Sequence, residues 1–302
     1  MTRTRLVGVA LARRPGPGGG RSRARWPGWA RAVAWLALLL GVLRVAGAAD
    51  LPPDMARILG RGELRVAMHR DDQPKFFARG PTGELDGLDV ALARDIAATL
   101  KVGVRFLREA DTFDGVVDVV ARGEADVALS VLSRTLPRAQ RVRFTTPYAE
   151  LHQALLLNRL RAAPLRLDDD PAAGLNRAGV RVGVVAGSAY VGFAREGFPA
   201  AETVLCETWD AAVRDLLAGL LHAVLYDDVE VRAWQKAHPE QSLYVKAGVL
   251  EGRRDPLAMA VHWRDTHWLA WLNLYLRSAA DNGTLARLQR RYLRDEPTGG
   301  PP

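Results

Sequence analysis

The chain of 302 residues contains a single cysteine, Cys206. No disulfide can therefore form within it, and no cysteine lies directly after the apolar run at residues 32–43 to accept a lipid. Apolar residues flank Cys206, so we expect it to be a small core residue. The histidines show no metal-ligand spacing. We therefore expect neither a metal nor another cofactor.

Long apolar runs are also scarce. The run at residues 32–43 has 12 residues, whereas a membrane-spanning helix needs about 20. Nine arginines and no acid lie within the first 49 residues, and Ala46 and Ala48 give a small-x-small pattern after the run. This order is typical of a secretory signal peptide. We predict that residues 1–49 are cleaved and that the rest of the chain is exported to the periplasm; an uncleaved anchor is the alternative.

The folded part of the sequence lacks an excess of positive charge. The formal charge of +8 falls to about −1 when the nine arginines of the first 49 residues are removed. A protein that binds the phosphate backbone needs a basic surface, so we do not expect nucleic acid as a partner. With 48% hydrophobic residues, the chain can bury one large core or two smaller ones.

Short apolar runs alternate with amphipathic stretches from residue 64 onward. The alternation predicts helices packed on mainly parallel sheets. Two such cycles, separated by a loop rich in Pro, Gly and Asp, suggest two lobes. A tail of two helices at 265–293 breaks at Asp281-Asn282-Gly283, with Asp265 as a candidate N-cap. The predicted strands are 64–68, 104–106, 125–130, 180–185, 203–207 and 222–227, and the predicted helices are 88–100, 113–123, 188–196 and 209–219.

Polar side chains follow three of the predicted strands, where ligands bind in open α/β sheets. Arg138, after the strand at 125–130, can hold a carboxylate through two hydrogen bonds, and Ser133 adds a hydroxyl. Ser188 opens a helix whose free amides suit an anion, and Asp227 suits an ammonium group. Each residue alone has an ordinary explanation as surface arginine, helix cap or turn former. Together they predict an α-amino acid site.

From residue 62 to 295 the sequence resembles the family 3 periplasmic solute-binding proteins, the polar amino acid receptors of ABC transporters. The resemblance rests on "LRVA" (64–67), "GELDGLDVALARDIAATL" (83–100), "FDGVVDVVARGEADVALS" (113–130) and "SRTLPRAQRVRFTTPY" (133–148). "RVGVVAGSAY", "GLLHAVLYDD" and "ADNGTLARLQRRYL" fill the family's remaining signatures.

The resemblance implies a type II periplasmic binding protein fold with two hinge strands, near residues 150–154 and 253–256. It implies a monomeric receptor, not an enzyme, that captures an amino acid or related carboxylated small molecule between its lobes and delivers it to an ABC permease in the inner membrane. The expected organisation is a signal peptide (1–49), lobe 1 (50–151), lobe 2 (152–255), a return to lobe 1 with C-terminal helices (256–298) and a tail (299–302).

Site residues also follow from the resemblance. Arg138 matches the arginine for the ligand α-carboxylate and Asp227 the aspartate for its ammonium group. The remaining matches are Ser133 beside the arginine, Ser130 where a backbone or hydroxyl group meets the ligand, Ser188 and Ala189 at the helix start, and Phe113 as an aromatic that packs on the ligand side chain.

The first loop, "MHRDDQPKFF" (68–77), departs from the family pattern. His69 and Asp72 stand where the family has an acidic or polar residue and an aromatic, so we expect both residues at the ligand site. The aromatic wall is missing or rebuilt from Phe76 or Phe77. The acids Asp71, Asp72 and Asp111 either favour a basic ligand or are exposed loop carboxylates. The first loop therefore does not specify which side chain the ligand has.

Two other functions are compatible with the same pattern. One is an enzyme similar to periplasmic cyclohexadienyl dehydratases, with His69, Glu150 or Asp72 as the acid. The other is a sensor input or a helper of a periplasmic oxidoreductase, in which the unusual first loop reflects weakened ligand binding.

Overall fold

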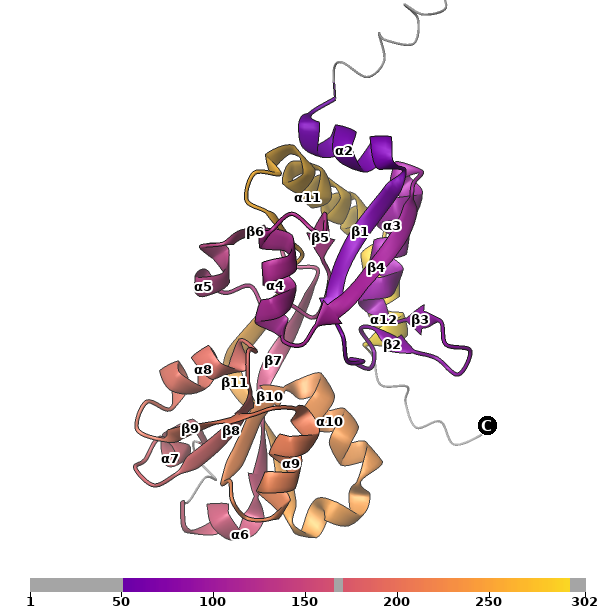
Figure 1. Ribbon diagram of the computed structural model, residues 1–302. Helices are drawn as coiled ribbons and strands as arrows, with labels where there is room; N and C mark the ends of the chain where they lie inside the picture. Colours follow the sequence, from indigo (N-terminus) through magenta and orange to yellow (C-terminus); the bar gives the residue numbers. More distant parts are fainter. Residues whose placement is uncertain (1–50, 166–170, 294–302) are drawn as a thin grey trace, which may run out of the picture. The chain divides into compact units, whose positions relative to one another are not determined.

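The computed structural model describes residues 51–165 and 171–293 (Figure 1). The predicted signal peptide at residues 1–49 and the predicted tail at residues 299–302 lie outside this range. Within the described residues, none of the helices combines the length and the apolar character that crossing a membrane requires. The described chain forms two five-stranded sheets and one small two-stranded sheet, β2 (Ala78–Arg79) with β3 (Leu85–Asp86).

The first sheet has the strand order β4-β1-β5-β12-β6. β1 pairs in parallel with β4 and β5, while β12 pairs antiparallel with β5 and β6. Helices α3 and α4 follow the first strands along the chain, and the C-terminal helices also pack on this lobe. The bounds are α2 (Pro53–Arg61), β1 (Glu63–His69), α3 (Leu88–Leu100), β4 (Gly103–Ala110), α4 (Phe113–Ala121), β5 (Val127–Ala128), α5 (Leu136–Ala139), β6 (Val142–Phe144), β12 (Ala260–His262), α11 (Thr266–Asp281) and α12 (Thr284–Tyr292).

The second sheet has the order β11-β7-β10-β8-β9. β8 pairs in parallel with β9 and β10, while β7 pairs antiparallel with β10 and β11. The bounds are β7 (Ala149–Asn158), α6 (Arg159–Ala162), η1 (Ala163–Leu165), α7 (Pro171–Leu175), β8 (Arg181–Val185), α8 (Tyr190–Gly197), β9 (Glu202–Cys206), α9 (Trp209–Leu217), β10 (Ala223–Asp227), α10 (Asp228–Ala237), η2 (Pro239–Leu243) and β11 (Val245–Leu257). The predicted α/β class, with two sheets flanked by helices, is confirmed. Both sheets are mixed, because the strands outside the predicted β-α-β cycles add antiparallel pairs.

Strands β7 and β11 connect the two sheets. They pair in two stretches, Val245 to Val249 and Arg254 to Leu257, with an irregularity between them. At the end of β11, Leu257 forms an isolated antiparallel β-bridge with Ser133, in the loop after β5 of the first sheet. The predicted lobe boundaries after residues 151 and 255 fall inside these two strands, and as lobe boundaries they stay a prediction.

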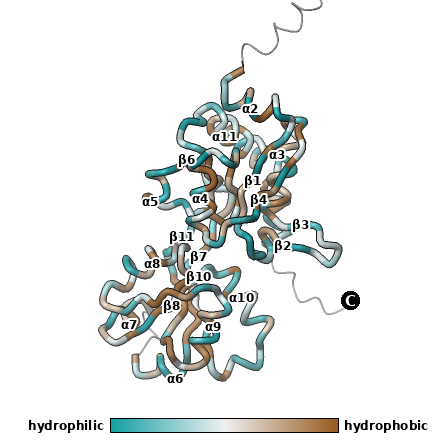
Figure 2. Tube along the Cα trace, in the orientation of Figure 1, coloured by the Kyte–Doolittle hydropathy of each residue, from teal (hydrophilic) through white to brown (hydrophobic). Residues whose placement is uncertain are grey.

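Separate hydrophobic clusters stabilise the two sheets. The second sheet's cluster contains Leu155, Val184, Leu225 and the buried Cys206. Apolar colour gathers along β8 and its neighbours in Figure 2. In the first lobe, one cluster packs α3 and α11 on the sheet and another packs α4 on it. Burial of this apolar surface is the main favourable term for folding.

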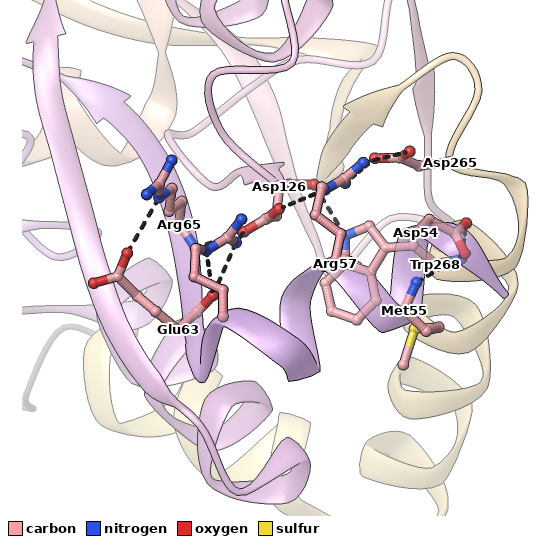
Figure 3. Close-up of polar contacts among 9 residues, drawn as sticks. Asp54, Met55, Arg57, Glu63, Arg65, Asp126, Asp265 and Trp268 are labelled. Atoms are coloured by element: carbon pink, nitrogen blue, oxygen red, sulfur yellow. Dashed lines mark hydrogen bonds and ion pairs between the residues drawn. The ribbon is translucent and has the colours of Figure 1, made fainter. Parts of the chain in front are cut away.

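The start of α11 differs from the prediction (Figure 3). The Asp265 side chain makes no cap hydrogen bond; its carboxylate accepts from the Arg57 guanidinium at 3.2 and 2.6 Å. Asp54, in the first turn of α2, accepts instead from the amides of His267 at 3.0 Å and Trp268 at 2.9 Å. Asp265 holds the predicted N-cap position of α11, but its side chain does not cap the helix amides, because the carboxylate of Asp54, distant in sequence, accepts from them instead.

Candidate functional site

A small pocket of about 280 Å³, including its open mouth, lies where the ends of β5, β8 and β10 meet; we call it the inner pocket. The structure brings six predicted site residues to its wall. Four residues that the sequence reasoning did not single out complete it. The predicted residues are Phe113, Ser133, Arg138, Ser188, Ala189 and Asp227, and the others are Val131, Tyr190, Tyr226 and Asp255.

Arg138 supplies the positive charge of the inner pocket. It lies on α5 and is only 6% exposed. Its Nε donates to Asp114 Oδ1 at 2.9 Å, and its terminal nitrogens donate to Ser133 O at 3.3 Å and Gly187 O at 3.5 Å. A guanidinium has five N–H donors, so one remains on each terminal nitrogen. That pair is the set that a bidentate carboxylate uses.

The turn before α8 approaches Arg138 through its backbone. Gly187 has φ +68°, and a Cβ there would lie 2.7 Å from Thr112 Cβ, so a side chain would clash. Its carbonyl accepts from the Asp114 amide at 3.0 Å. The Ser188 hydroxyl donates to Val185 O at 2.6 Å, and Val191 is the first residue of α8 to donate back into the turn, to Ser188 O. The amides of Ala189 and Tyr190 precede it and suit an anion.

Asp227 ends β10 and caps α10, where one of its oxygens accepts from the Glu230 amide at 2.8 Å. It is 6% exposed. Burial is the main cause that raises the pKa of Asp227 to about 7. The hydrogen bond from the Glu230 amide lowers this pKa, and the charges of Glu230, Asp255 and Asp228 raise it. A cation bound beside the carboxylate would favour its charged form.

Asp255, on β11, was missed by the sequence reasoning. It is 1% exposed, and its Oδ2 accepts from Ser133 Oγ at 3.0 Å and Tyr190 Oη at 2.9 Å. Burial raises its pKa. Its Oδ1 has no hydrogen-bond partner within the described chain. The only signal in the sequence was an aspartate before proline in an expected hinge strand.

The loop that carries Ser133 and Arg138 starts from a constrained backbone. Val131 has φ +49°, a conformation that β-branched residues rarely adopt. Its amide donates to Asp89 Oδ2 at 2.8 Å, and Tyr148 Oη donates to Asp89 Oδ1 at 2.8 Å. Ser130 is fully buried and accepts from the His69 amide at 2.9 Å, outside both pocket walls. It joins the ends of β1 and β5, and its contact with a ligand stays a prediction.

A wider pocket of about 1140 Å³, including its open mouth, shares Phe113 and Tyr226 with the inner pocket. We call it the acidic pocket, because six carboxylates and a single arginine, Arg70, line it. Of the predicted site residues, His69 and Asp72 lie here. The carboxylates are Asp71, Asp72, Asp111, Glu207, Asp210 and Glu230.

The acids of the first lobe have basic partners. Asp72 accepts from Arg108 at 2.7 Å, and Asp111 accepts from Arg70 at 2.6 Å. The acids of the second lobe differ: in the described part of the chain, Glu207, Asp210 and Glu230 form no ion pair. Burial and the charge of Asp210 raise the pKa of Glu230, while the charge of Lys75 lowers it. A ligand cation would therefore find its strongest attraction on this side.

The aromatic wall of the acidic pocket does not come from the first loop. Phe76 and Phe77 are 3% and 0% exposed in the lobe 1 core, because backbone bonds from the start of α3 hold this turn against the helix. The alternative in which Phe76 or Phe77 rebuilds the aromatic wall is therefore wrong. Trp209 and Tyr226 supply the wall instead, with ring centroids 5.1 Å apart.

His69 has both ring nitrogens occupied. Its Nδ1 accepts from the Asp71 amide at 3.1 Å, and its Nε2 lies 2.9 Å from the Asp111 carbonyl. Its ring packs on Phe113 at 4.9 Å, and burial lowers its pKa. His69 therefore orients Phe113 and the loop at Asp111 as a neutral imidazole.

The structure has two mixed α/β lobes joined by two strands, with an arginine on α5 and an aspartate at the end of β10 in one pocket. These features define a two-lobed binding protein for small solutes. The chain belongs to the bacterial extracellular solute-binding proteins, family 3, whose pattern it matches over residues 64–295. Membership is thus established for nearly all of the described residues.

Among its relatives is the ABC transporter arginine-binding protein 1 of Escherichia coli, 25% identical over 226 residues, which cover 73% of this chain and 86% of that protein. Another is the membrane-bound lytic murein transglycosylase F of Pseudomonas putida, 28% identical over 87% of this chain. The chain spans about half of that transglycosylase, 52% of its length. A solved binding component of an ABC transporter from Wolinella succinogenes, complexed with lysine, is 25% identical with a TM-score of 0.66, covering 78% of this chain and 97% of the other.

Proposed function

We propose that the protein is a periplasmic receptor that captures an amino acid with a cationic side chain between its lobes and delivers it to an ABC permease. One observation carries the proposal: a buried arginine, the free amides of a helix start and a buried aspartate line one pocket. Arg138 and the amides of Ala189 and Tyr190 bind the α-carboxylate, and Asp227 binds the ammonium group. Phe113 packs on the ligand beside them.

The acidic pocket supports the choice of side chain. A ligand held by its α-carbon groups in the inner pocket extends past Phe113 and Tyr226, which line both pockets. There it meets Glu207, Asp210 and Glu230. A lysine or arginine side chain places its charge among these carboxylates and its methylene groups against Trp209. The arginine-binding relative and the lysine-bound structure agree with this class.

Export and lobe motion belong to the same proposal. We infer that residues 1–49 direct export to the periplasm, that the lobes span 50–151 and 152–255 with a return at 256–298, and that they close about β7 and β11. The protein then works as a monomer, and the closed form is the one the permease recognises.

The dehydratase alternative needs an acid at the bound ring. The candidates His69, Asp72 and Glu150 do not line the inner pocket. His69 is held by two backbone groups, Asp72 pairs with Arg108, and Glu150 pairs with Arg254 at 3.5 Å. The geometry therefore favours binding over elimination.

A thermal-shift screen of the purified mature protein tests the proposed function. The panel contains lysine, arginine, ornithine, citrulline, glutamate and leucine, together with prephenate and arogenate. A ligand that binds the folded state stabilises it by RT ln(1 + [L]/Kd). We expect the largest shifts with the cationic amino acids. No shift with any amino acid, or turnover of prephenate or arogenate, would contradict the proposal.

A further inference from the structure

We propose that Asp255 is a specificity-determining residue that binds the ligand's ammonium group together with Asp227. This inference rests on the proposed function and deepens it. Asp255 lines the inner pocket, and of its two carboxylate oxygens only Oδ2 is hydrogen-bonded within the described chain.

The free oxygen of Asp255 needs a donor. A carboxylate oxygen that is buried without a hydrogen bond is unfavourable, because it has lost its hydrogen bonds with water. Ser133 Oγ and Tyr190 Oη both donate to Oδ2, so they fix the carboxylate while leaving Oδ1 unsatisfied. An ammonium group has three N–H donors. Oδ1 of Asp255 and the carboxylate of Asp227 can each accept one of them.

The charges of the inner pocket point to the same ligand group. Arg138 is its single cation, and Asp227 and Asp255 are its two carboxylates. Asp114 also pairs with Arg138 at the rim. One arginine and one aspartate would balance a zwitterion, so Asp255 leaves an excess of negative charge. The two buried carboxylates are close enough that the charge of Asp255 raises the pKa of Asp227. An ammonium group placed between them relieves this repulsion.

The consequence is a strict requirement for the α-ammonium group. A ligand without it, such as 5-guanidinopentanoate, the des-amino analogue of arginine, would bring a carboxylate to a pocket that already holds two. It would leave Oδ1 of Asp255 unsatisfied. Such analogues should bind at least about 100-fold more weakly than arginine.

The test is calorimetric titration of arginine and 5-guanidinopentanoate into the wild type, Asp255→Asn and the control Asp265→Asn. Asparagine keeps an oxygen for Ser133 and Tyr190 but removes the charge. We expect Asp255→Asn to bind arginine about 10-fold or more weakly and the analogue within about threefold of the wild type. Asp265 is also a buried aspartate, 4% exposed, but lies outside both pockets, so its variant should leave both affinities unchanged.

An equal loss for both ligands would mean that Asp255 only shapes the pocket, and an unchanged affinity for arginine would mean that it does not contact the ligand; either result overturns the inference. Asp255→Ser repeats the comparison if the asparagine variant does not fold. If the wild type binds no amino acid, the proposed function fails, which is a result distinct from these.

Discussion

The inner pocket and the acidic pocket share Phe113 and Tyr226, but their charged groups lie in different surroundings. In the inner pocket Arg138 is 6% exposed and Asp255 1%. In the acidic pocket the side chains of Asp71 and Asp111 are 55% and 66% exposed. Buried charges lose much of their interaction with water and are costly when left unpaired, whereas exposed charges are screened. The inner pocket should therefore discriminate sharply, and the acidic pocket more weakly and in a salt-dependent way.

Removal of the buried arginine should have the largest effect. Arg138→Ala leaves a ligand carboxylate without its partner and should lower the affinity for arginine or lysine by about 2 to 5 kcal/mol. Calorimetry measures the change. Arg134→Ala is the matched control, because Arg134 is exposed in the same loop and lines neither pocket. Equal affinities for the wild type and Arg138→Ala would show that the carboxylate binds elsewhere.

Neutralising Asp227 should stabilise the empty protein at high pH. Its folded-state pKa of about 7 lies above the ordinary 3.8, so its stabilising contribution is complete below about pH 4 and is lost as pH rises to about 7. Asp227→Asn lacks this loss and keeps the cap of α10. Relative to the wild type, the variant should therefore gain about 3 kcal/mol of stability as pH rises from 4.5 to 8. It should also lose ligand affinity. Denaturant unfolding at both pH values measures this.

A difference between the two proteins that stays constant with pH would contradict the buried, charge-crowded environment assigned to Asp227.

Single changes in the acidic pocket should have the smallest effects. Asp210→Asn or Glu230→Gln should lower the affinity for lysine or arginine by about 0.5 to 1 kcal/mol, more at low ionic strength. The affinity for leucine or glutamine should not fall. Glu202→Gln is the control, since Glu202 pairs with Arg181 outside both pockets. Calorimetric titrations at two salt concentrations measure these changes in affinity. A loss of affinity that is independent of salt and of ligand charge would argue against electrostatic recognition.

The sequence predicted the inner pocket better than the acidic one, and the reason is physical. Arg138, Ser188 and Asp227 follow strands of clear periodicity, so the carboxyl ends of the sheets place them together. Asp255 escaped notice because its function depends on the pairing of β7 with β11, which no local pattern shows. Trp209 was assigned only to a helix, and its approach to Tyr226 depends on how α9 packs on β10.

Asp265 shows the same limit of prediction from local sequence signals. A cap position is a local signal. In the structure, however, the distant Asp54 accepts from an amide at the start of α11, and Asp265 accepts from the Arg57 guanidinium instead. Phe76 and Phe77 are candidates for the aromatic wall because they lie in the first loop, but the pairing of their turn with α3 buries them instead. Contacts between distant segments decide such cases.

The central claim is that the inner pocket recognises the groups on the α-carbon while the acidic pocket recognises side-chain charge. Calorimetric titration of the wild type with arginine, citrulline and arginine amide tests it most directly. Citrulline loses only the side-chain charge and should bind about 10-fold more weakly; arginine amide loses the carboxylate that Arg138 holds and should bind about 100-fold or more weakly. Arginine amide binding as tightly as arginine, or citrulline binding more tightly, would contradict the account.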